Sequence, residues 1–317
     1  MARDLTGGPA QTVLTASVAR RYYMDGKSKI EIAHELNLSR FKVARLLDAA
    51  RSSGLVHIEI SYPGAIDVNL SDRLQDMFGL QHAIVVDTPD DDEASLRQHL
   101  GKATAELLSE IVTAEDVVGL AWARTVSAMS TALTRLTATP VVQLTGALSR
   151  PDGEDSAVDV VREVARVSGG PAYLFHAPFI VPDAATAHAL RKQPEVARAF
   201  AQFGSVTKAV AGIGRWESGQ STLYDAAEEK ERRLLRRQGV CADISGVFVK
   251  ADGIPVRTAL NDRMIGVTAA QMQAIPEVIA IPYGTVKAPA VRAALRSGLV
   301  TGLVTHSTLA RALLTDE

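Results

Sequence analysis

Hydrophobic positions between residues 28 and 50 follow two short helices that are separated by a three-residue turn. Ser28 and Glu31 have the spacing of a capping box, so the first helix is predicted to begin at Ser28. Asn37 lies in the turn, where a residue with positive φ is required and asparagine tolerates it. The positions of this first segment that are predicted to face inward are Ile30, Ala33, Leu36 and Leu38.

Ser39 is expected to cap the second helix, whose apolar stripe contains Val43, Leu46, Leu47 and Ala50. Its first two turns then present polar and aromatic side chains outward, at Arg40, Phe41, Lys42 and Arg45. Two helices joined in this way predict a helix-turn-helix, in which this part of the second helix reaches base edges in the major groove.

Base reading is expected from Arg40, Phe41 and Lys42, while Arg45 and Arg51 are expected to hold phosphates. Phe41 has two open interpretations, a contact with a thymine methyl group or a place in the core of the head. The complete predicted DNA-binding set is Ser28, Ser39, Arg40, Phe41, Lys42, Arg45 and Arg51.

The head has further expected elements on both sides of this pair. Residues 13–26 predict a helix that ends at Gly26, and residues 55–60 alternate as the strand of a small wing. A hinge is expected at 62–64, and an amphipathic linker helix at 67–78. The predicted domains are therefore a winged-like head at 1–62, a linker helix at 63–80 and a larger domain at 81–317.

From residue 82 onward, short apolar runs alternate with helical segments. The strand candidates are 83–86, 117–120, 141–144, 172–175, 206–213, 278–281 and 303–305. The main helical stretches are 94–112, 126–137, 155–168 and 287–297. This alternation is typical of a doubly wound, mostly parallel, Rossmann-like α/β domain.

Ligands on such sheets bind outside the carboxyl ends of the strands. Four loops at predicted strand ends are candidates, at 119–125, 143–148, 212–215 and 281–287. Arg124 and Thr125 begin a predicted helix, where backbone N–H groups attract an anion. Lys287 also stands at a helix start, where a cation is unfavourable unless an anion offsets it.

Composition narrows the class of protein. A single cysteine, Cys241, excludes an intrachain disulfide, and there is no zinc-ligand spacing, so neither a metal nor a cofactor is expected. The polar N-terminus and the absence of an apolar run of about 20 residues favour a cytoplasmic protein without membrane association. Residues 1–63 hold nine Lys/Arg against six Asp/Glu, a net of +3, within a chain of net charge −2. This modest asymmetry agrees with a DNA-binding head.

Head and body both resemble the SorC family of bacterial transcriptional regulators. The head residues that carry the resemblance are Tyr22, Tyr23, Ile32, Ala33, Leu38, Ser39, Arg40, Val43, Arg45, Leu46, Leu47, Ala50, Arg51, Gly54, Leu55 and Val56. In the body they are Gly119 to Trp122, Arg124, Thr125, Gln143 to Gly146, Gly169, Gly170, Ala177, Pro178 and the stretch from Gly253 to Leu314.

The resemblance implies an effector domain related to phosphosugar isomerases and to glucosamine-6-phosphate deaminase. Gly212 to Gly214 resembles the glycine loop of the deaminase, and Gly284 to Ala288 resembles its phosphate-binding loop. It also implies a homotetramer, a dimer of dimers, that binds double-stranded operator DNA. A sugar, a polyol or a sugar phosphate would change its DNA affinity and so control a carbohydrate catabolic operon.

One position departs from the family pattern. Ala123 stands where the family usually has glycine, and its Cβ narrows the approach of an anion to the backbone. This departure favours a smaller or unphosphorylated ligand, whereas Arg124, Thr125 and Lys287 still suit a phosphate. Some relatives form a Schiff base through a lysine near the third strand. Residues 141–146 of this chain contain no lysine, so no Schiff base is expected here.

Two of the effector candidates have two open interpretations each. Trp122 either stacks on a sugar or belongs to the core, and Asp262 either binds hydroxyls or caps a helix. The complete predicted effector-binding set is Trp122, Ala123, Arg124, Thr125, Gln143, Gly146, Gly214, Asn261, Asp262, Gly284, Thr285 and Lys287.

The predicted function is a sequence-specific, effector-controlled transcriptional regulator, and two alternatives remain. An isomerase or deaminase needs a placed acid and base. The residues after Gly214 are Arg215, Trp216 and Glu217, without the histidine of the deaminase pattern, and Thr145 to Ala147 replaces its acidic pair. No catalytic residue is therefore assigned. The second alternative is a helix-turn-helix regulator that needs no effector.

Overall fold

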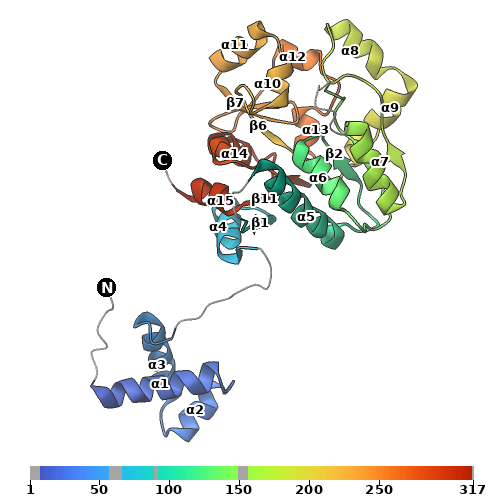
Figure 1. Ribbon diagram of the computed structural model, residues 1–317. Coiled ribbons are helices and arrows are strands. Elements are labelled where there is room, and N and C mark those ends of the chain that lie inside the picture. Colours follow the sequence, from blue (N-terminus) through green and yellow to red (C-terminus); the bar gives the residue numbers. More distant parts are fainter. Residues whose placement is uncertain (1–7, 57–65, 89–91, 149–155, 316–317) are drawn as a thin grey trace. The chain divides into compact units, whose positions relative to one another are not determined.

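The computed structural model describes residues 8–56, 66–88, 92–148 and 156–315. The chain forms two compact units, Met1–Ser61 and Tyr62–Glu317 (Figure 1). No helix in the described ranges is long and apolar enough to span a membrane.

Within residues 8–56, the smaller unit contains three helices around one small core. They are α1 (Pro9–Tyr23), α2 (Lys29–Glu35) and α3 (Arg40–Ser52). The capping box of Ser28 and Glu31 is present, and the Ser39 hydroxyl accepts a hydrogen bond from the Lys42 amide. Asn37 has a φ of 50°, as the tight turn requires. The buried apolar side chains of this core are Val18, Ala19, Ile32, Ala33, Val43, Leu46, Leu47 and Ala50.

Ile30 was predicted to face inward, and that prediction is wrong. Its side chain is 65% exposed, whereas Ile32 is completely buried. The reason is helical phase, because two residues along a helix correspond to about 200° of rotation. The predicted wing at 55–60, apart from its first two residues, and the hinge at 62–64 lie outside the described residues.

The larger unit is built on a seven-stranded sheet in which every pairing is parallel, in the order β1-β11-β10-β5-β2-β3-β4. The strands are β1 (His82–Val86), β2 (Val118–Leu120), β3 (Val141–Gln143), β4 (Ala172–Tyr173), β5 (Lys208–Ala211), β10 (Glu277–Ala280) and β11 (Gly302–His306). The predicted parallel α/β class is therefore confirmed.

Helices cover both faces of this sheet, because the side chains of neighbouring strand residues point to opposite faces and pack in different hydrophobic cores. Val210 joins the core of α5 (Glu93–Ile111), α6 (Arg124–Ala132) and α7 (Ala157–Ser168). Ala209 and Ala211 join the core that contains α4 (Val68–Phe78), α14 (Ala288–Arg296) and α15 (Ser307–Leu314). Continuous apolar strands with helices on both faces are what a doubly wound sheet requires.

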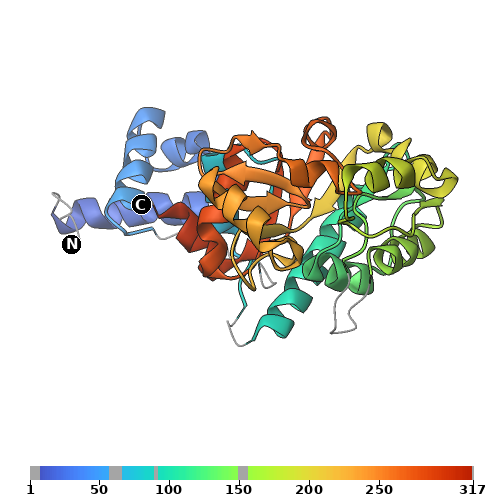
Figure 2. The ribbon, with the colours of Figure 1, turned by 90° about the horizontal axis from the view of Figure 1, so that it is seen from above.

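Shorter helices complete the larger unit. Figures 1 and 2 show α8 (Ala184–Arg191) and α9 (Pro194–Phe200) at the end of this unit that lies away from α14 and α15. The remaining elements are α10 (Thr222–Ala226), α11 (Glu229–Arg237), α12 (Ala259–Asp262), α13 (Ala269–Gln273) and the 3₁₀ turns η1 (Phe203–Ser205) and η2 (Thr285–Lys287).

The structure contains a second sheet that the sequence pattern did not predict. It is antiparallel, in the order β6 (Ile213–Arg215), β7 (Val240–Ile244), β8 (Val247–Lys250) and β9 (Pro255–Val256). The single strand predicted at 206–213 is in fact β5 and the start of β6, which Gly212 separates. The chain thus leaves the parallel sheet at Gly212 and enters the antiparallel one.

Helix α4 belongs to the larger unit, although 63–80 was predicted to be a linker. Asp67 caps it by accepting a hydrogen bond from the Leu70 amide at 2.9 Å. Leu70 and Leu74 are buried in the same core as α14 and α15. Ile66, immediately before α4, forms an antiparallel bridge with Val86 at the end of β1.

Candidate functional site

The outer face of α3 carries the side chains that the sequence predicted to meet DNA. Arg40, Phe41, Lys42 and Arg45 are all exposed. Phe41 is 72% exposed, so the alternative that places it in the core is wrong. The Arg40 guanidinium lies 5.5 Å from the centroid of the Phe41 ring, which puts a cation beside an apolar group at the start of α3.

The other three predicted DNA-binding residues have partners within the head. The hydroxyls of Ser28 and Ser39 accept hydrogen bonds from backbone amides of α2 and α3. Arg51 forms an exposed ion pair with Asp48, with 2.8 Å between guanidinium nitrogen and carboxylate oxygen. Such an exposed pair contributes little to stability and is easily exchanged for a phosphate.

A cavity of about 740 Å³ lies in the larger unit, at the carboxyl ends of strands of the parallel sheet. Its walls come from the starts of α5 and α6, the loop after β10, the end of β11 and the antiparallel sheet. Predicted effector residues that line it are Trp122, Ala123, Arg124, Thr125, Gly146, Gly214, Gly284, Thr285 and Lys287. Nine of the twelve candidates therefore meet in one place.

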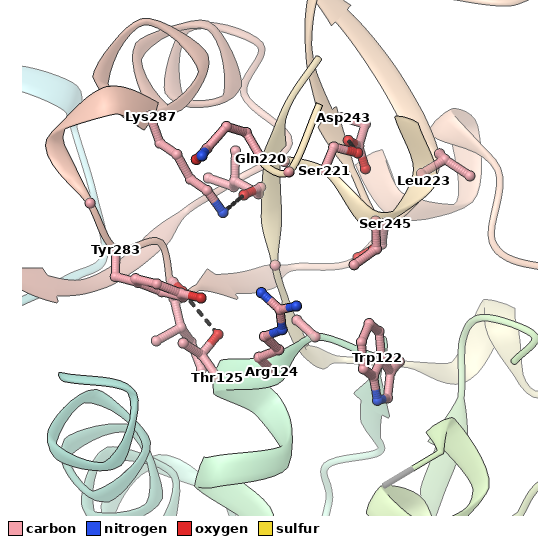
Figure 3. A pocket seen from close by; sticks show the side chains of 18 of the residues that line it. Trp122, Arg124, Thr125, Gln220, Ser221, Leu223, Asp243, Ser245, Tyr283 and Lys287 are labelled. Carbon is pink, nitrogen blue, oxygen red and sulfur yellow. Dashed lines mark hydrogen bonds between the residues drawn. The ribbon is translucent and has the colours of Figure 1, made fainter. Parts of the chain in front are cut away.

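Two basic side chains point toward the same space in this cavity, Arg124 from α6 and Lys287 from η2 (Figure 3). The Lys287 ammonium donates a hydrogen bond to the Ile213 carbonyl oxygen at 3.2 Å and lies 5.1 Å from the centroid of the Tyr283 ring. Burial lowers the pKa of Lys287, and the neighbouring Arg124 lowers it further, while Asp243 acts in the opposite direction.

The start of α6 is open toward the cavity. Its N-cap is Ala123, which supplies no side-chain hydrogen bond to the first-turn amides. Thr125 is held in place because its hydroxyl donates to the Ile281 carbonyl oxygen at 3.0 Å. Gly284 has a φ of +83°, and its N–H donates to Nε2 of His306 at 3.1 Å. A helix N-terminus beside two cations forms an environment that suits an anion.

A buried carboxyl group faces the cavity from the antiparallel sheet. Asp243 on β7 is only 6% exposed, and its Oδ1 accepts a hydrogen bond from the Ser221 hydroxyl at 2.6 Å. Burial raises the pKa of Asp243. An ideal Cβ on Gly214 would lie 2.3 Å from that Oδ1, so only glycine fits there. A carboxyl and a hydroxyl held together in this way suit the hydroxyl groups of a ligand.

Three predicted effector residues do not line the cavity. Gln143 is completely buried and links the segments that follow β3 and β4, donating to the carbonyl oxygens of Thr145 and Phe175 and accepting from the Phe175 amide. Asn261 accepts from the Thr258 amide and donates to the Gly246 carbonyl. Asp262 pairs with Arg257 at the surface. These polar side chains serve the fold, and sequence spacing alone does not separate that role from binding.

Sequence reasoning also missed cavity residues. Asp243, Ser221 and Ser245 come from the antiparallel sheet and its helix, which were not predicted, while Tyr283 and His306 come from elements that were. One signal was present, because Asp243 is a lone carboxylate within the apolar run from Val240 to Ile244. A buried charge in a strand is costly unless something compensates it. The described residues contain no cluster of acidic, histidine or cysteine side chains that could hold a metal ion.

A family model described as "Putative sugar-binding domain" matches residues 64–315 of this chain. The uncharacterized transcriptional regulator YjhU of Escherichia coli (strain K12) is 30% identical over 309 residues, 93% of this chain and 92% of that protein. The chain belongs to the SorC family. This SorC-family protein is accordingly a DNA-binding transcriptional regulator with a carbohydrate effector domain.

Two further relatives agree with this assignment. The deoxyribonucleoside regulator of Bacillus subtilis (strain 168) is 28% identical over 96% of this chain and 97% of that protein. The full-length sorbitol operon regulator SorC from Klebsiella pneumoniae superposes with a TM-score of 0.73 at 22% identity, covering 96% of this chain and all of that chain. At that identity the superposition establishes the fold.

Replacing Gln143 tests its reassignment from the effector site to the fold. Gln143→Leu leaves two carbonyl groups and one amide of buried backbone without their partner, which is expected to cost about 2–4 kcal/mol of unfolding free energy. Chemical denaturation measures this loss. Gln75→Leu, at an exposed position of α4, is the control and should change stability little. A stable Gln143→Leu protein that binds ligand poorly would restore the original prediction.

Proposed function

We propose that this SorC-family regulator responds to a small phosphorylated sugar or polyol that binds in the cavity and changes operator affinity. The carrying observation is that one cavity joins two cations and the N-terminus of α6 with a buried carboxyl–hydroxyl pair. Relatives named for a deoxyribonucleoside and for a sorbitol operon support a carbohydrate as the effector.

The phosphate is proposed to lie between Arg124, Lys287 and the first-turn amides of α6. Ala123 is compatible with this position. An ideal Cβ on Gly212 would lie 2.6 Å from the Ala123 methyl, so that methyl group occupies the space in front of Gly212. A phosphate here would offset the cost of holding two cations close together in a partly buried site.

The hydroxyl groups of the effector are proposed to meet Asp243, Ser221 and Ser245, and Trp122 is proposed to stack on an apolar sugar face (Figure 3). A ligand with an anionic end and several hydroxyls matches both ends of the cavity. An unphosphorylated sugar offers these two cations no charged acceptor.

The protein is proposed to act as a regulator without enzymatic turnover. The residues after Gly214 point to this, because Arg215 and Glu217 pair with each other at 2.6 Å and Trp216 is buried in the aromatic core. None of these three side chains takes the place of the acid and base that the related deaminase pattern contains.

The operator is proposed to be read by Arg40, Phe41 and Lys42, with Arg45 and Arg51 on phosphates. A single small head buries too little surface for tight specific binding, so a homotetramer built as a dimer of dimers is proposed to present heads in pairs. The protein is also proposed to act in the cytoplasm, where it would control a carbohydrate catabolic operon.

Arg45→Ala tests the division between base contacts and phosphate contacts. Loss of one phosphate contact should weaken binding to all DNA sequences alike and reduce the slope of log affinity against log salt by about 1. Electrophoretic mobility or anisotropy titrations over a salt series measure both quantities. Arg40→Ala is the matched comparison and should reduce discrimination at particular base pairs. A change in base preference for Arg45→Ala would reverse the two roles.

Lys287→Met tests the anionic end of the cavity. Loss of a charged hydrogen-bond donor should weaken binding of inorganic phosphate by about 10-fold to 100-fold in calorimetry. Lys102→Met, on the exposed side of α5, is the control and should leave the affinity unchanged.

The same titrations have a predicted pH dependence. Because burial lowers the pKa of Lys287, wild-type affinity should fall as the pH rises through that depressed pKa and the ammonium loses its proton. Lys287→Met should lack this alkaline loss. As the pH falls through the second pKa of inorganic phosphate, both proteins should bind more weakly, since phosphate then carries less charge. Equal affinity of both proteins at every pH would exclude Lys287 from the phosphate site.

A further inference from the structure

The loop that holds the proposed phosphate is tied to the end of β11. The Gly284 amide donates to Nε2 of His306 at 3.1 Å, and the Thr305 hydroxyl donates to the Pro282 carbonyl oxygen at 3.0 Å. His306 and Thr305 are both buried, at 2% and 0% exposure. His306 also lines the cavity, and it is the last residue of β11. This one residue therefore belongs both to the cavity wall and to a buried strand.

The end of β11 is in turn tied to the end of β1. His306 stands opposite Val86 in the parallel register of these two strands. Directly after it, the Ser307 hydroxyl donates to Oδ1 of Asp87 at 3.0 Å. A displacement of the turn at His306 and Ser307 therefore acts on Val86 and Asp87.

The end of β1 holds the segment through which the chain from the head joins the larger unit. Ile66 forms an antiparallel bridge with Val86, and the Asp67 amide donates to the Val85 carbonyl oxygen at 2.8 Å. The Val85 amide donates to the Ser71 hydroxyl at 2.9 Å, which fixes the first turn of α4. Figure 1 shows β1, β11, α4 and α15 together in this part of the larger unit.

We propose that His306 is a positioning residue that couples the effector cavity to the bridge between Ile66 and Val86. This proposal rests on the proposed function, since it requires an anion at the Gly284 loop. A phosphate oxygen is a stronger acceptor for an amide than a neutral imidazole nitrogen, because its hydrogen bonds are charge-assisted. The proposal places an oxygen of the phosphate that Lys287 holds within reach of the Gly284 amide in the same loop, so effector binding draws that amide away from His306.

Release of that hydrogen bond removes one restraint on the turn at His306 and loosens the bridge at Val86. The effector then favours an arrangement in which the segment leading to the head is held less firmly, and this difference is the coupling free energy. A purely structural His306 would stabilise the sheet without making the bridge sensitive to ligand, and the two roles give different experimental results.

Hydrogen exchange of the full-length protein, with inorganic phosphate as the probe, separates a coupling role of His306 from a purely structural one. Phosphate is expected to slow exchange in most of the larger unit by ordinary stabilisation, yet to speed exchange at the Asp67 and Val85 amides by about fivefold. His306→Leu, which lacks the acceptor, should bind phosphate but lose the local acceleration. His306→Gln, which offers an acceptor oxygen in its place, should retain it.

Asp87 provides a second pair of variants at an exposed position, which keeps the test open should His306→Leu fail to fold. Asp87→Ala removes the acceptor of Ser307 and should reduce the acceleration, whereas Asp87→Asn keeps an acceptor and should preserve it. Asp72→Ala, on the exposed side of α4, is the control.

The outcomes distinguish this proposal from the proposed function. Phosphate binding without acceleration at Asp67 and Val85 would overturn the coupling role of His306 and leave the effector site standing. The coupling role would also be overturned if both the Leu and Ala variants keep the full acceleration. Absence of phosphate binding by calorimetry would overturn the anion site and, with it, this proposal.

Discussion

The cavity depends on the point where the chain leaves the parallel sheet, at Gly212. An ideal Cβ there would lie 2.6 Å from the Ala123 methyl group, so β5 must be followed by a residue without a side chain. The next residues reach the other walls. The Ile213 carbonyl oxygen accepts from Lys287, and Gly214 leaves room for the carboxyl of Asp243. Gly212, Ile213 and Gly214 thus lie next to Ala123 at the start of α6, Lys287 and Asp243 in turn.

Burial acts on the two charged ends of the cavity in opposite directions. It lowers the pKa of Lys287 and raises the pKa of Asp243, because both charged forms lose solvation. A site that keeps an ammonium and a carboxyl group in such surroundings carries a cost in the unliganded protein. A ligand with a phosphate and hydroxyl groups would relieve that cost at both ends. Binding of such a ligand would therefore explain why the cavity contains both Lys287 and Asp243.

Local rules in the sequence predicted the parallel sheet and the starts of α2 and α3, because caps and apolar runs act over a few residues. Ser28, Ser39 and Asn37 all have their expected conformations. The antiparallel sheet was missed because β6 continues the apolar run of β5 and β9 is two residues long. Gln143 and Asn261 were predicted to bind the effector but bind backbone outside the cavity, because an amide that binds backbone has the same sequence signature as one that binds a ligand.

Selection of a phosphorylated carbohydrate by the cavity is the central claim. Thermal denaturation of the full-length protein with matched pairs, such as sorbitol with sorbitol 6-phosphate and 2-deoxyribose with its 5-phosphate, tests it most directly. We expect stabilisation by a phosphorylated member, about 2.7 kcal/mol at 100 times its Kd, and no comparable effect of its unphosphorylated partner. Stabilisation by unphosphorylated members alone would contradict the claim.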